Sequence, residues 1–393
     1  MKVITDDNKI QELLERGVEE VIDKNHLKKR LESGEKLRVK LGIDPTSPNL
    51  HLGRSIPLLK MRDFQELGHQ LVFIVGDFTG VIGDTSDKES ERPMLEQEIV
   101  KKNMKNYVDQ AGKIIDISKC EVYYNSEWLK KLTYVELNEQ ANMFSVAEFI
   151  ARDNIRRRLE AGTRVSLREV LYPLMQGYDS VAVKADVELG GTDQRFNLLA
   201  GRTMQPHYKQ QSQDIIMNPL MAGTDGRKMS SSWGNTVNLT DEPNEMFGKI
   251  MSIPDELIIL YFTCMTRVPM EIVEEYTKEM KKGENPRNLK MKLGFELVRF
   301  YHGEKAAKIA EEYFINTFAK KQTPTDIPEL KPTSYNIIEV LVESGLSTGK
   351  SDARRAIEQG GVKVNDEKIE AFDYDTKPED VIQKGKRFFV KVK

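Results

Sequence analysis

Residues 37–75 read LRVKLGIDPTSPNLHLGRSIPLLKMRDFQELGHQLVFIV, and this stretch decides the fold. Leu37 to Ile43 is a short apolar run typical of a buried strand, and Gln70 to Val75 is a second one. Between them, Leu52 to Leu67 carries apolar side chains at mostly helical spacing, and Gly68 closes the predicted helix. Two strands joined by one helix form a βαβ unit, which implies a parallel sheet covered on both faces.

The composition indicates a chain of several folded domains with nearly balanced charge. Its 393 residues contain 59 Lys and Arg against 62 Asp and Glu, a formal net charge of −3, and 39% of them are hydrophobic. At about 100–200 residues per domain, this length predicts two or three domains. The balance gives the whole chain no electrostatic attraction to nucleic acid, but it can hide a local basic face.

Nothing in the sequence suggests a membrane or an export route. The longest apolar run, around Leu71 to Val75, is far shorter than the roughly 20 residues that span a bilayer. The first ten residues, MKVITDDNKI, have early acids and no apolar block, unlike a secretory signal. Cys120 and Cys264 have no CxxC partner, which argues against a disulfide scaffold or a structural zinc site. We therefore expect a cytoplasmic protein with no membrane partner and no protein-bound metal.

The parallel sheet is expected to continue beyond the first βαβ unit. Further short strands are predicted at Glu121–Tyr124, Val181–Leu189 and Asp214–Met217, separated by helical stretches. Strands that alternate with helices favour an α/β domain of the Rossmann-like, parallel-sheet type. This first domain is expected to occupy residues 1–225.

Two further units are expected after it. Residues 226–321 carry a flexible loop and then a helical pattern, which predicts an α-helical domain. Residues 322–334 are proline-rich with few large apolar groups, the composition of a linker. Residues 335–393 read as a small α+β unit, with helices followed by short strands at Val362–Val364 and Phe388–Val392.

The segment Gly42 to Arg54, GIDPTSPNLHLGR, lies between the first predicted strand and its helix. Ligands of open α/β sheets bind in the crevice at this carboxyl end of the strands. His51 and Gly53 fall at the helix start, where free N–H groups and the helix dipole attract anions. An imidazole there can donate to a phosphate oxygen, and a glycine lets a nucleotide approach the backbone. Taken alone, the segment is equally compatible with an ordinary loop and an incidental histidine.

The segment Gly223 to Asn235, GTDGRKMSSSWGN, carries Arg227 and Lys228 in a loop of small residues. Such a loop suits closure over a triphosphate while charge moves to the leaving pyrophosphate. Taken alone, it also reads as a solvated linker between two domains.

Together these two segments resemble HIGH and KMSKS, the paired nucleotide signatures of class I aminoacyl-tRNA synthetases, in the right order. The sequence between them narrows the resemblance. LYPLMQGYDS at 171–180 and LGGTDQ at 189–194 are both close to the amino-acid pocket of the tyrosyl-tRNA synthetases. The resemblance covers essentially the whole chain. It implies a Rossmann-like catalytic domain, a helical anticodon-binding domain that follows the KMSKS loop, and a C-terminal RNA-binding domain.

The resemblance also implies roles for individual residues. Asp179 would face the phenolic hydroxyl of a tyrosine substrate, and the residues that hold its ammonium and carboxylate groups would complete the pocket. The implied tyrosine-binding residues are Tyr172, Gln176, Asp179, Gln194, Asp84 and Lys40. The implied ATP-binding residues are Gly42, Asp44, His51, Gly53, Arg54, Gly190, Asp193 and Lys228. The implied catalytic residues are His51, Thr46, Lys88, Arg92, Lys228 and Ser232.

Three positions depart from the family pattern. Arg54 stands where HIGH has its second histidine, and Ser231 stands where KMSKS has its second lysine. Together the two changes roughly conserve the positive charge around the phosphates, which we interpret as a redistribution. Lys40 stands where many relatives have a tyrosine that touches the substrate phenol. Asp179 would then carry more of the discrimination alone, or with the help of a water.

The C-terminal unit resembles the S-four RNA-binding domain. The match rests on residues 341–366, LVESGLSTGKSDARRAIEQGGVKVND. From residue 335 onward there are eleven basic and eleven acidic residues, so any basic face must be local. Such a face would contact phosphates and position an RNA without reading its sequence. The implied RNA-binding residues are Lys350, Arg354, Arg355 and Lys363.

The resemblance implies a two-step ligase. The carboxylate of tyrosine would attack the α-phosphate of ATP to give tyrosyl-adenylate and pyrophosphate, and the terminal adenosine of tRNA(Tyr) would then take the tyrosyl group. Mg2+ is expected with the nucleotide, held mainly by phosphates and water. The family acts as a homodimer, and the helical stretch Glu136 to Arg158 is a candidate interface.

Two other functions stay open on the sequence alone. Arg54 and Ser231 are compatible with an RNA-binding protein that kept the synthetase fold and lost amino-acid activation. Lys40 lends slight support to a ligase that activates another aromatic amino acid. Amino-acid-dependent exchange between ATP and pyrophosphate separates all three.

Overall fold

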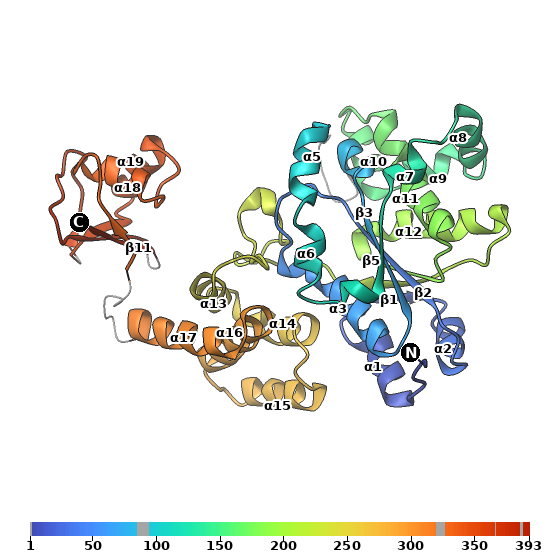
Figure 1. Cartoon of the computed structure of the whole chain (residues 1–393), viewed down its shortest axis with the longest axis horizontal. Helices are drawn as coiled ribbons and strands as arrows, with labels where there is room; N and C mark the ends of the chain where they lie inside the picture. The colour runs from blue at the N-terminus through green and yellow to red at the C-terminus, as the bar shows by residue number, and fades with distance from the viewer. Residues whose placement is uncertain (1, 85–93, 320–326, 366, 386–387) are drawn as a thin grey trace. The chain divides into compact units, whose positions relative to one another are not determined.

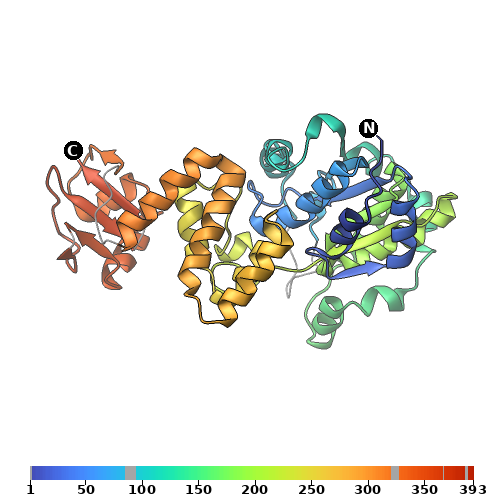
Figure 2. The same ribbon diagram turned by 90° about the horizontal axis from the view of Figure 1, so that it is seen from below.

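A computed structural model describes residues 2–84, 94–319, 327–365, 367–385 and 388–393 of the chain. The chain divides into two compact units. The first consists of residues 1–241 with 252–293, and the second of residues 242–251 with 294–393. Figures 1 and 2 show the elements of both units from two directions.

The first unit is built on a six-stranded sheet in the order β1-β6-β5-β2-β3-β4 (Figure 1). All neighbouring strands are parallel except the edge strand β1, which pairs antiparallel with β6. The strands are β1 (Glu20–Ile22), β2 (Arg38–Ile43), β3 (Gln70–Val75), β4 (Cys120–Tyr124), β5 (Val187–Gly191) and β6 (Asp214–Asn218).

The helices of this unit lie between these strands in the chain, except for the first, which precedes them, and the last two, which follow them. They are α1 (Asp7–Glu15), α2 (Lys24–Glu32), α3 (Leu52–Glu66), α4 (Thr79–Ile82), α5 (Gln97–Met104), α6 (Tyr107–Ala111), α7 (Ser126–Leu129), α8 (Tyr134–Ala141), α9 (Val146–Ile150), α10 (Asp153–Glu160), α11 (Leu167–Val183), α12 (Arg195–Met204), α14 (Ile258–Met265) and α15 (Met270–Lys281). The predicted βαβ unit is confirmed as β2-α3-β3, and Gly68 follows the helix with a φ of 92°. Every residue of β3 from Leu71 to Val75 is buried, as a strand covered on both faces requires.

The strand order creates a crevice at the centre of the sheet. From β2 the chain proceeds to β3 and β4 on one side, whereas β5 and β6 lie on the other side. The connections that leave the carboxyl ends of β2 and β5 therefore run in opposite directions. Such a switch point is where open α/β sheets bind their ligands. The segments after β2 and β5 are Asp44 to His51 and Thr192 to Gln194, both of which contain predicted site residues.

One predicted strand was wrong in its first half. Val181–Leu189 was predicted as a single strand, but residues 181–183 end α11, and β5 begins only at Val187. Lys184 adopts a left-handed conformation, with a φ of 51°, and separates the two elements. Val183 is buried against Val72 of β3, so its apolar side chain serves the end of a helix. A short apolar run cannot by itself distinguish these two environments.

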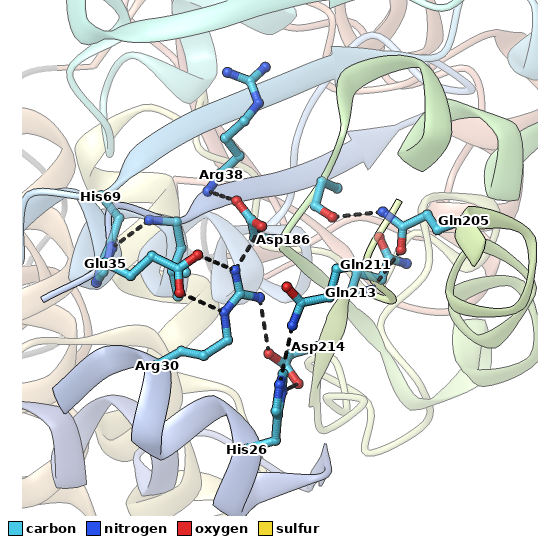
Figure 3. A network of polar contacts seen from close by, with 12 residues as sticks. His26, Arg30, Glu35, Arg38, His69, Asp186, Gln205, Gln211, Gln213 and Asp214 are labelled. Carbon is cyan, nitrogen blue, oxygen red and sulfur yellow. Dashed lines mark hydrogen bonds and ion pairs between the residues drawn. The ribbon is translucent and has the colours of Figure 1, made fainter. Parts of the chain in front are cut away.

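A polar network ties the opposite, amino-terminal end of the sheet together (Figure 3). The guanidinium of Arg30 on α2 lies 2.8 Å from Asp186, directly before β5, and 3.6 Å from Asp214 at the start of β6. Arg30 also pairs with Glu35, and His26 lies 2.9 Å from the buried Asp214. These contacts fix α2 to the two strands at the end of the sheet that lies away from the crevice.

The second unit contains helices and a small sheet, drawn in orange to red in Figure 2. The sheet has five strands in the order β7-β11-β10-β8-β9. Its strands are β7 (Glu329–Leu330), β8 (Val362–Val364), β9 (Glu367–Lys368), β10 (Val381–Lys384) and β11 (Phe388–Val392). Its helices are α13 (Pro243–Met251), α17 (Glu304–Phe314), the π-helical turn Ile315–Ala319, α18 (Ile337–Glu343) and α19 (Lys350–Glu358), while α16 (Pro286–His302) crosses from the first unit.

The tail of the second unit has its own apolar core. Ile337 and Leu341 of α18, Ile357 of α19 and Val362 of β8 are buried together in it. Two residues of the segment expected to be a linker, in β7, pair in parallel with β11. The folded tail therefore begins earlier than residue 335. Among the residues that the structure describes, no helix combines the length and the apolar character needed to cross a bilayer.

Candidate active site

Three polar side chains lie along one face of α11. The helix begins after Ser166, whose side chain accepts a hydrogen bond from the backbone N–H of Glu169 in a capping box. Tyr172, Gln176 and Asp179 follow at i, i+4 and i+7, which places them on one helix face. At 1.5 Å per residue, the first and the last are about 10 Å apart along the helix axis.

Asp179 is a buried carboxyl group with both oxygens held in place. Trp128 Nε1 donates to its Oδ1 at 2.7 Å, and Asn125 Nδ2 donates to its Oδ2 at 3.2 Å. The residue is only 4% exposed, and this burial raises the pKa of Asp179 to about 7, against the lowering influence of Lys40 and the two donors. A carboxylate has about four acceptor sites, so Asp179 can still accept a further hydrogen bond.

Asp44 follows β2 directly and joins it to α11. Its Oδ1 accepts from Thr79 Oγ1 at 2.6 Å, and its Oδ2 accepts from the hydroxyl of Tyr172 at 2.8 Å. Burial raises the pKa of Asp44 to about 6. Gly76 makes the approach of Asp44 possible, because a methyl group there would collide with Asp44 Oδ1. The Tyr172 hydroxyl donates its only proton to Asp44, so its oxygen can still accept a hydrogen bond from a third group.

Asp84 and Gln194 meet across the crevice. Gln194 Nε2 donates to Asp84 Oδ2 at 2.6 Å, and Gln194 Oε1 accepts from Asn197 at 2.9 Å. The negative charge of Asp84 is one of the causes that raise the pKa of Asp44. The two carboxyl groups therefore concentrate negative charge near Tyr172, where a cationic group would be stabilised.

The structure places Lys40 below the cleft. The side chain is fully buried, and its Nζ donates to the carbonyl of Gln176, to Ser180 Oγ and to Glu188 Oε1. An ammonium group has three donors, and these acceptors use all of them.

The HIGH-like and KMSKS-like segments touch each other. His51 occupies the N-cap position of α3 without a side-chain capping hydrogen bond, and Gly53 in the first turn lies against Met229, with 3.3 Å between Gly53 N and Met229 Sδ. Burial, together with the positive charges of Arg54 and Lys228, lowers the pKa of His51 to about 3. The imidazole is therefore neutral, and its buried Nδ1 has no hydrogen-bond partner among the residues that the structure describes.

Arg54 supports the loop that follows β2. Its guanidinium donates to the backbone carbonyl of Asp44 at 3.0 Å and to Thr46 Oγ1 at 3.2 Å. Tyr107 holds the next turn by donating to the carbonyl of Ser47 at 2.6 Å. The arginine thus brings a permanent positive charge to this loop and orients it.

Lys228 reaches the end of β5. Its Nζ lies 3.1 Å from Asp193 Oδ2. The loop around it is held by Asn235, which donates to the carbonyl of Lys228 at 3.0 Å and accepts from Ser230 N at 2.8 Å. Ser232 is exposed and contacts the hydroxyl of Ser230. Of the two predicted residues in this loop, the structure therefore brings Lys228 to the sheet edge and leaves Ser232 at the surface.

The predicted glycines differ in their surroundings. A side chain at Gly42 would meet open space, so this position leaves the surface above β2 free for a ligand. At Gly190 an added methyl group would press against Leu198, so this glycine also serves packing. Lys88 and Arg92 lie outside the residues that the structure describes.

Comparison with known proteins identifies the family. Residues 5–319 match the family model of the class I tRNA synthetases for tryptophan and tyrosine. A curated tyrosine–tRNA ligase from Thermotoga maritima is 46% identical, over 97% of this chain and 96% of its own length. The chain belongs to the class I tyrosyl-tRNA synthetase family. Residues 319–391 also match the model of the SYY-like C-terminal domain of tyrosine–tRNA ligases.

Further relatives of the synthetase family agree in length and fold. The tyrosine–tRNA ligase of Haemophilus influenzae is 42% identical over 99% of this chain and 98% of its own. A C-terminally truncated mitochondrial tyrosyl-tRNA synthetase from Aspergillus nidulans has a TM-score of 0.67 at 20% identity, covering 79% of this chain and 94% of that chain. The tyrosyl-tRNA synthetase from Archaeoglobus fulgidus, solved with L-tyrosine, has a TM-score of 0.62 at 23% identity, covering 77% and 99%. These structures confirm the predicted fold class.

The four predicted RNA-binding residues of this synthetase-family chain lie in the second unit. Arg354, Arg355 and Lys363 are exposed on α19 and β8. Lys350 is paired with Glu339 on α18. Lys384, another basic residue of the tail, is half-buried, and its Nζ lies 2.8 Å from Asp352 Oδ2.

Several site residues were not found from the sequence. Trp128 and Asn125 hold Asp179, Thr79 and Gly76 shape the surroundings of Asp44, and Asn235 holds the lysine loop. Four of the five have a common signal, because they come directly after the predicted strands β3 and β4. Residues that follow parallel strands meet at one edge of a sheet, so these positions could have been included.

Proposed function

We propose that this chain is a tyrosine–tRNA ligase that activates tyrosine with ATP and transfers it to tRNA(Tyr). One observation carries the proposal. The carboxyl group of Asp179 is buried at the end of the α11 face, with each oxygen oriented by a separate donor. A buried and oriented acceptor is what a site needs to read a hydroxyl group at the end of an apolar ring.

The α11 face suits the two ends of tyrosine. The phenol hydroxyl would donate to Asp179, and phenylalanine could not supply this additional hydrogen bond to the buried carboxylate. The ammonium group would donate to Tyr172, whose own proton is held by Asp44, and to the side-chain oxygen of Gln176. Asp84, already held by Gln194, would supply negative charge to the ammonium group, and Gln194 would complete the surroundings of the substrate carboxylate.

ATP would lie across the switch point. Gly42 leaves room above β2, and Asp44, Gly190 and Asp193 would line the ribose and adenine side. His51 and Gly53 mark the start of α3, where a phosphate is stabilised by the helix terminus. Arg54 would support this site through the loop that it holds.

Activation would need no covalent enzyme intermediate. The tyrosine carboxylate attacks the α-phosphorus, the bond to the bridging oxygen breaks, and pyrophosphate leaves. His51, kept neutral by its low pKa, can donate one N–H to a phosphate oxygen. Lys228 and Thr46 would stabilise the charge on the pyrophosphate side. Lys88, Arg92 and Ser232 are proposed for the same task by resemblance to the family.

Mg2+ would arrive with the nucleotide and bind mainly to phosphate oxygens and water. Within the described ranges, no three His, Cys, Asp or Glu side chains are grouped so that they could hold a metal ion.

Residues 226–321 are proposed as the loop and the helical anticodon-binding domain, and residues 335–393, together with β7, as the RNA-binding tail. In the tail, Arg354, Arg355 and Lys363 present positive charge to solvent, where phosphates of tRNA could be bound. Lys350 would join them after exchanging its partner Glu339 for a phosphate.

A homodimer and a cytoplasmic location complete the proposal. The expected interface, residues 136–158, overlaps α8, α9 and α10. Large apolar side chains are exposed on these helices and at the start of α11, which favours a second copy of the chain as their partner. They are Tyr134, Val135, Val146, Ile150, Leu159 and Leu167.

The test is the exchange of pyrophosphate into ATP, followed by charging of tRNA(Tyr). We expect exchange with tyrosine, far less with phenylalanine and tryptophan, and tyrosyl-tRNA when tRNA is added. Absence of exchange with all three, alongside intact tRNA binding, would indicate an RNA-binding protein without activation. Faster exchange with another aromatic amino acid would indicate a ligase that is specific for that amino acid instead of tyrosine.

A further inference from the structure

A charged pair lies at the centre of the sheet beneath the proposed tyrosine pocket. Lys40 of β2 and Glu188 of β5 face each other in the register of the two parallel strands. Their side chains are 0% and 1% exposed, and 2.8 Å separates Lys40 Nζ from Glu188 Oε1. Burying two charges costs several kcal/mol per ion, so such a pair persists only when its hydrogen bonds are complete.

The hydrogen bonds of the pair are complete on both sides. Lys40 uses its three donors on Glu188, on Ser180 Oγ and on the carbonyl of Gln176. Glu188 accepts from Lys40 and Gln176 Nε2 at one oxygen, and from Ser180 Oγ and Gln213 Nε2 at the other. The pair therefore connects β2 and β5 to two successive turns of α11.

The pair fixes the orientation of the Gln176 side chain. A carboxylate can only accept, so the amide nitrogen of Gln176 must face Glu188, at 3.2 Å. The amide oxygen then faces away from Glu188 and is available to a donor such as an ammonium group. The backbone carbonyl of the same residue is held by Lys40 at 3.1 Å. The side-chain amide and the backbone carbonyl of Gln176 are thus both held by the pair.

The pair also acts on Asp179 through charge. The groups around this carboxyl are Lys40 on β2, Glu188 on β5, and the donors Trp128 and Asn125 beyond β4. Burial raises the pKa of Asp179, Lys40 lowers it, and the smaller influence of Glu188 raises it. The pair as a whole therefore favours the ionised carboxylate that a phenol needs as its acceptor.

We propose that Lys40 and Glu188 are positioning residues for the amino-acid substrate, acting through Gln176 and Asp179 without touching the substrate. The proposal rests on the proposed function and adds a pair of residues to it. If the pair had only a structural role, replacing both charges would leave tyrosine binding unchanged. A buried ion pair can often be replaced by uncharged side chains with little loss of stability.

The decisive variant replaces both charges at nearly constant volume, Lys40→Met with Glu188→Gln. Without Glu188, the amide of Gln176 loses the partner that fixes its orientation. We expect KM for tyrosine to rise about ten- to a hundredfold, the loss expected for a hydrogen bond to a charged group. KM for ATP should stay within about twofold, since neither residue contacts the ATP side. The pH at which tyrosine binding reaches half its maximum should move upward, since Asp179 loses the charge that helps it to ionise.

The matched control is Arg30→Met, which breaks an ion pair with Asp186, directly before β5 (Figure 3). It should lower the melting temperature and leave KM for tyrosine unchanged. If the double variant does not accumulate as a folded protein, Lys40→Gln with Glu188→Gln carries the test, because it also removes both charges while each amide can still donate and accept hydrogen bonds.

The proposal is overturned if the tested variant melts like the wild type and keeps its KM for tyrosine and its pH profile. It is also overturned if KM rises equally for both substrates. A wild type without tyrosine-dependent exchange would instead refute the proposed function, so the two failures are distinguishable.

Discussion

Replacing Asp179 by asparagine should make the protein more stable at alkaline pH. Burial raises the pKa of this carboxyl from 3.8 in the unfolded chain to about 7 in the folded one. The folded state therefore keeps a proton that the unfolded state has already lost. This contribution to stability is fully present below pH 3.8 and is lost as the pH rises through 7. The amide side chain of the Asp179→Asn variant is neutral at every pH and would show no such loss.

The magnitude follows from the two pKa values. Between pH 5 and pH 8 the wild type should lose about 2.5 kcal/mol relative to Asp179→Asn. At about 2–4 °C per kcal/mol, the melting temperature of the variant should rise by roughly 5–10 °C relative to that of the wild type between pH 5 and pH 8. At pH 5 the variant should melt slightly below the wild type, because an amide nitrogen cannot accept the hydrogen bond that Asn125 or Trp128 donates to this carboxyl group.

Scanning calorimetry at four or five pH values measures this difference directly. The pKa of Asp44 is also raised, but both proteins share that group, so its influence cancels in the comparison. Asp7→Asn, at an exposed position of α1, serves as the control for a carboxylate-to-amide change outside the site. The reasoning would be refuted if the difference in melting temperature between Asp179→Asn and the wild type did not change with pH. It would also be refuted if the wild type became the more stable protein as the pH rises.

Three further variants test the remaining parts of the site and the tail. Lys228→Ala should lower kcat for exchange on the order of a hundredfold while KM for tyrosine stays within about twofold, since its charge acts on the leaving pyrophosphate. Arg54→Ala should raise KM for ATP about tenfold, because two hydrogen bonds to the loop after β2 are lost. Arg354→Ala with Arg355→Ala should reduce the salt dependence of tRNA binding, lowering the slope of log K against log salt by roughly 1.5. Steady-state kinetics and filter binding measure these effects, and an unchanged kcat, an unchanged KM or an unchanged slope would contradict them.

The centre of the fold could be predicted because its signals are local. The strand, helix and strand of residues 37–75 each carry their own periodicity, and the structure has them as β2, α3 and β3. Edge strand β1 was missed, because three half-buried residues carry no such pattern. The residues of α11 could be assigned to one face for the same local reason, since helical spacing fixes which side chains share a side.

The residues that hold the site residues in place could not be predicted in the same way. Lys40 was expected to contact the substrate because it stands where many relatives have a tyrosine that touches the substrate phenol. Its partner Glu188 lies 148 residues away in the sequence, and only the register of β2 with β5 brings the two together. Trp128 could not be predicted either. A tryptophan after a strand is usually interpreted as an apolar core residue, and only the structure shows that its indole N–H donates to Asp179.

The central claim is that the ionised carboxylate of Asp179 reads the phenol of tyrosine. The most direct measurement is the ratio of kcat/KM for tyrosine to kcat/KM for phenylalanine in ATP–pyrophosphate exchange, followed from about pH 6 to about pH 8.5, a range that brackets the ionisation of this group. Effects of pH on ATP binding and on the chemical step cancel in this ratio. We predict that the ratio favours tyrosine and rises with pH, with its midpoint near the pKa of about 7 of Asp179. A ratio near one, or a ratio that does not change with pH, would contradict the claim.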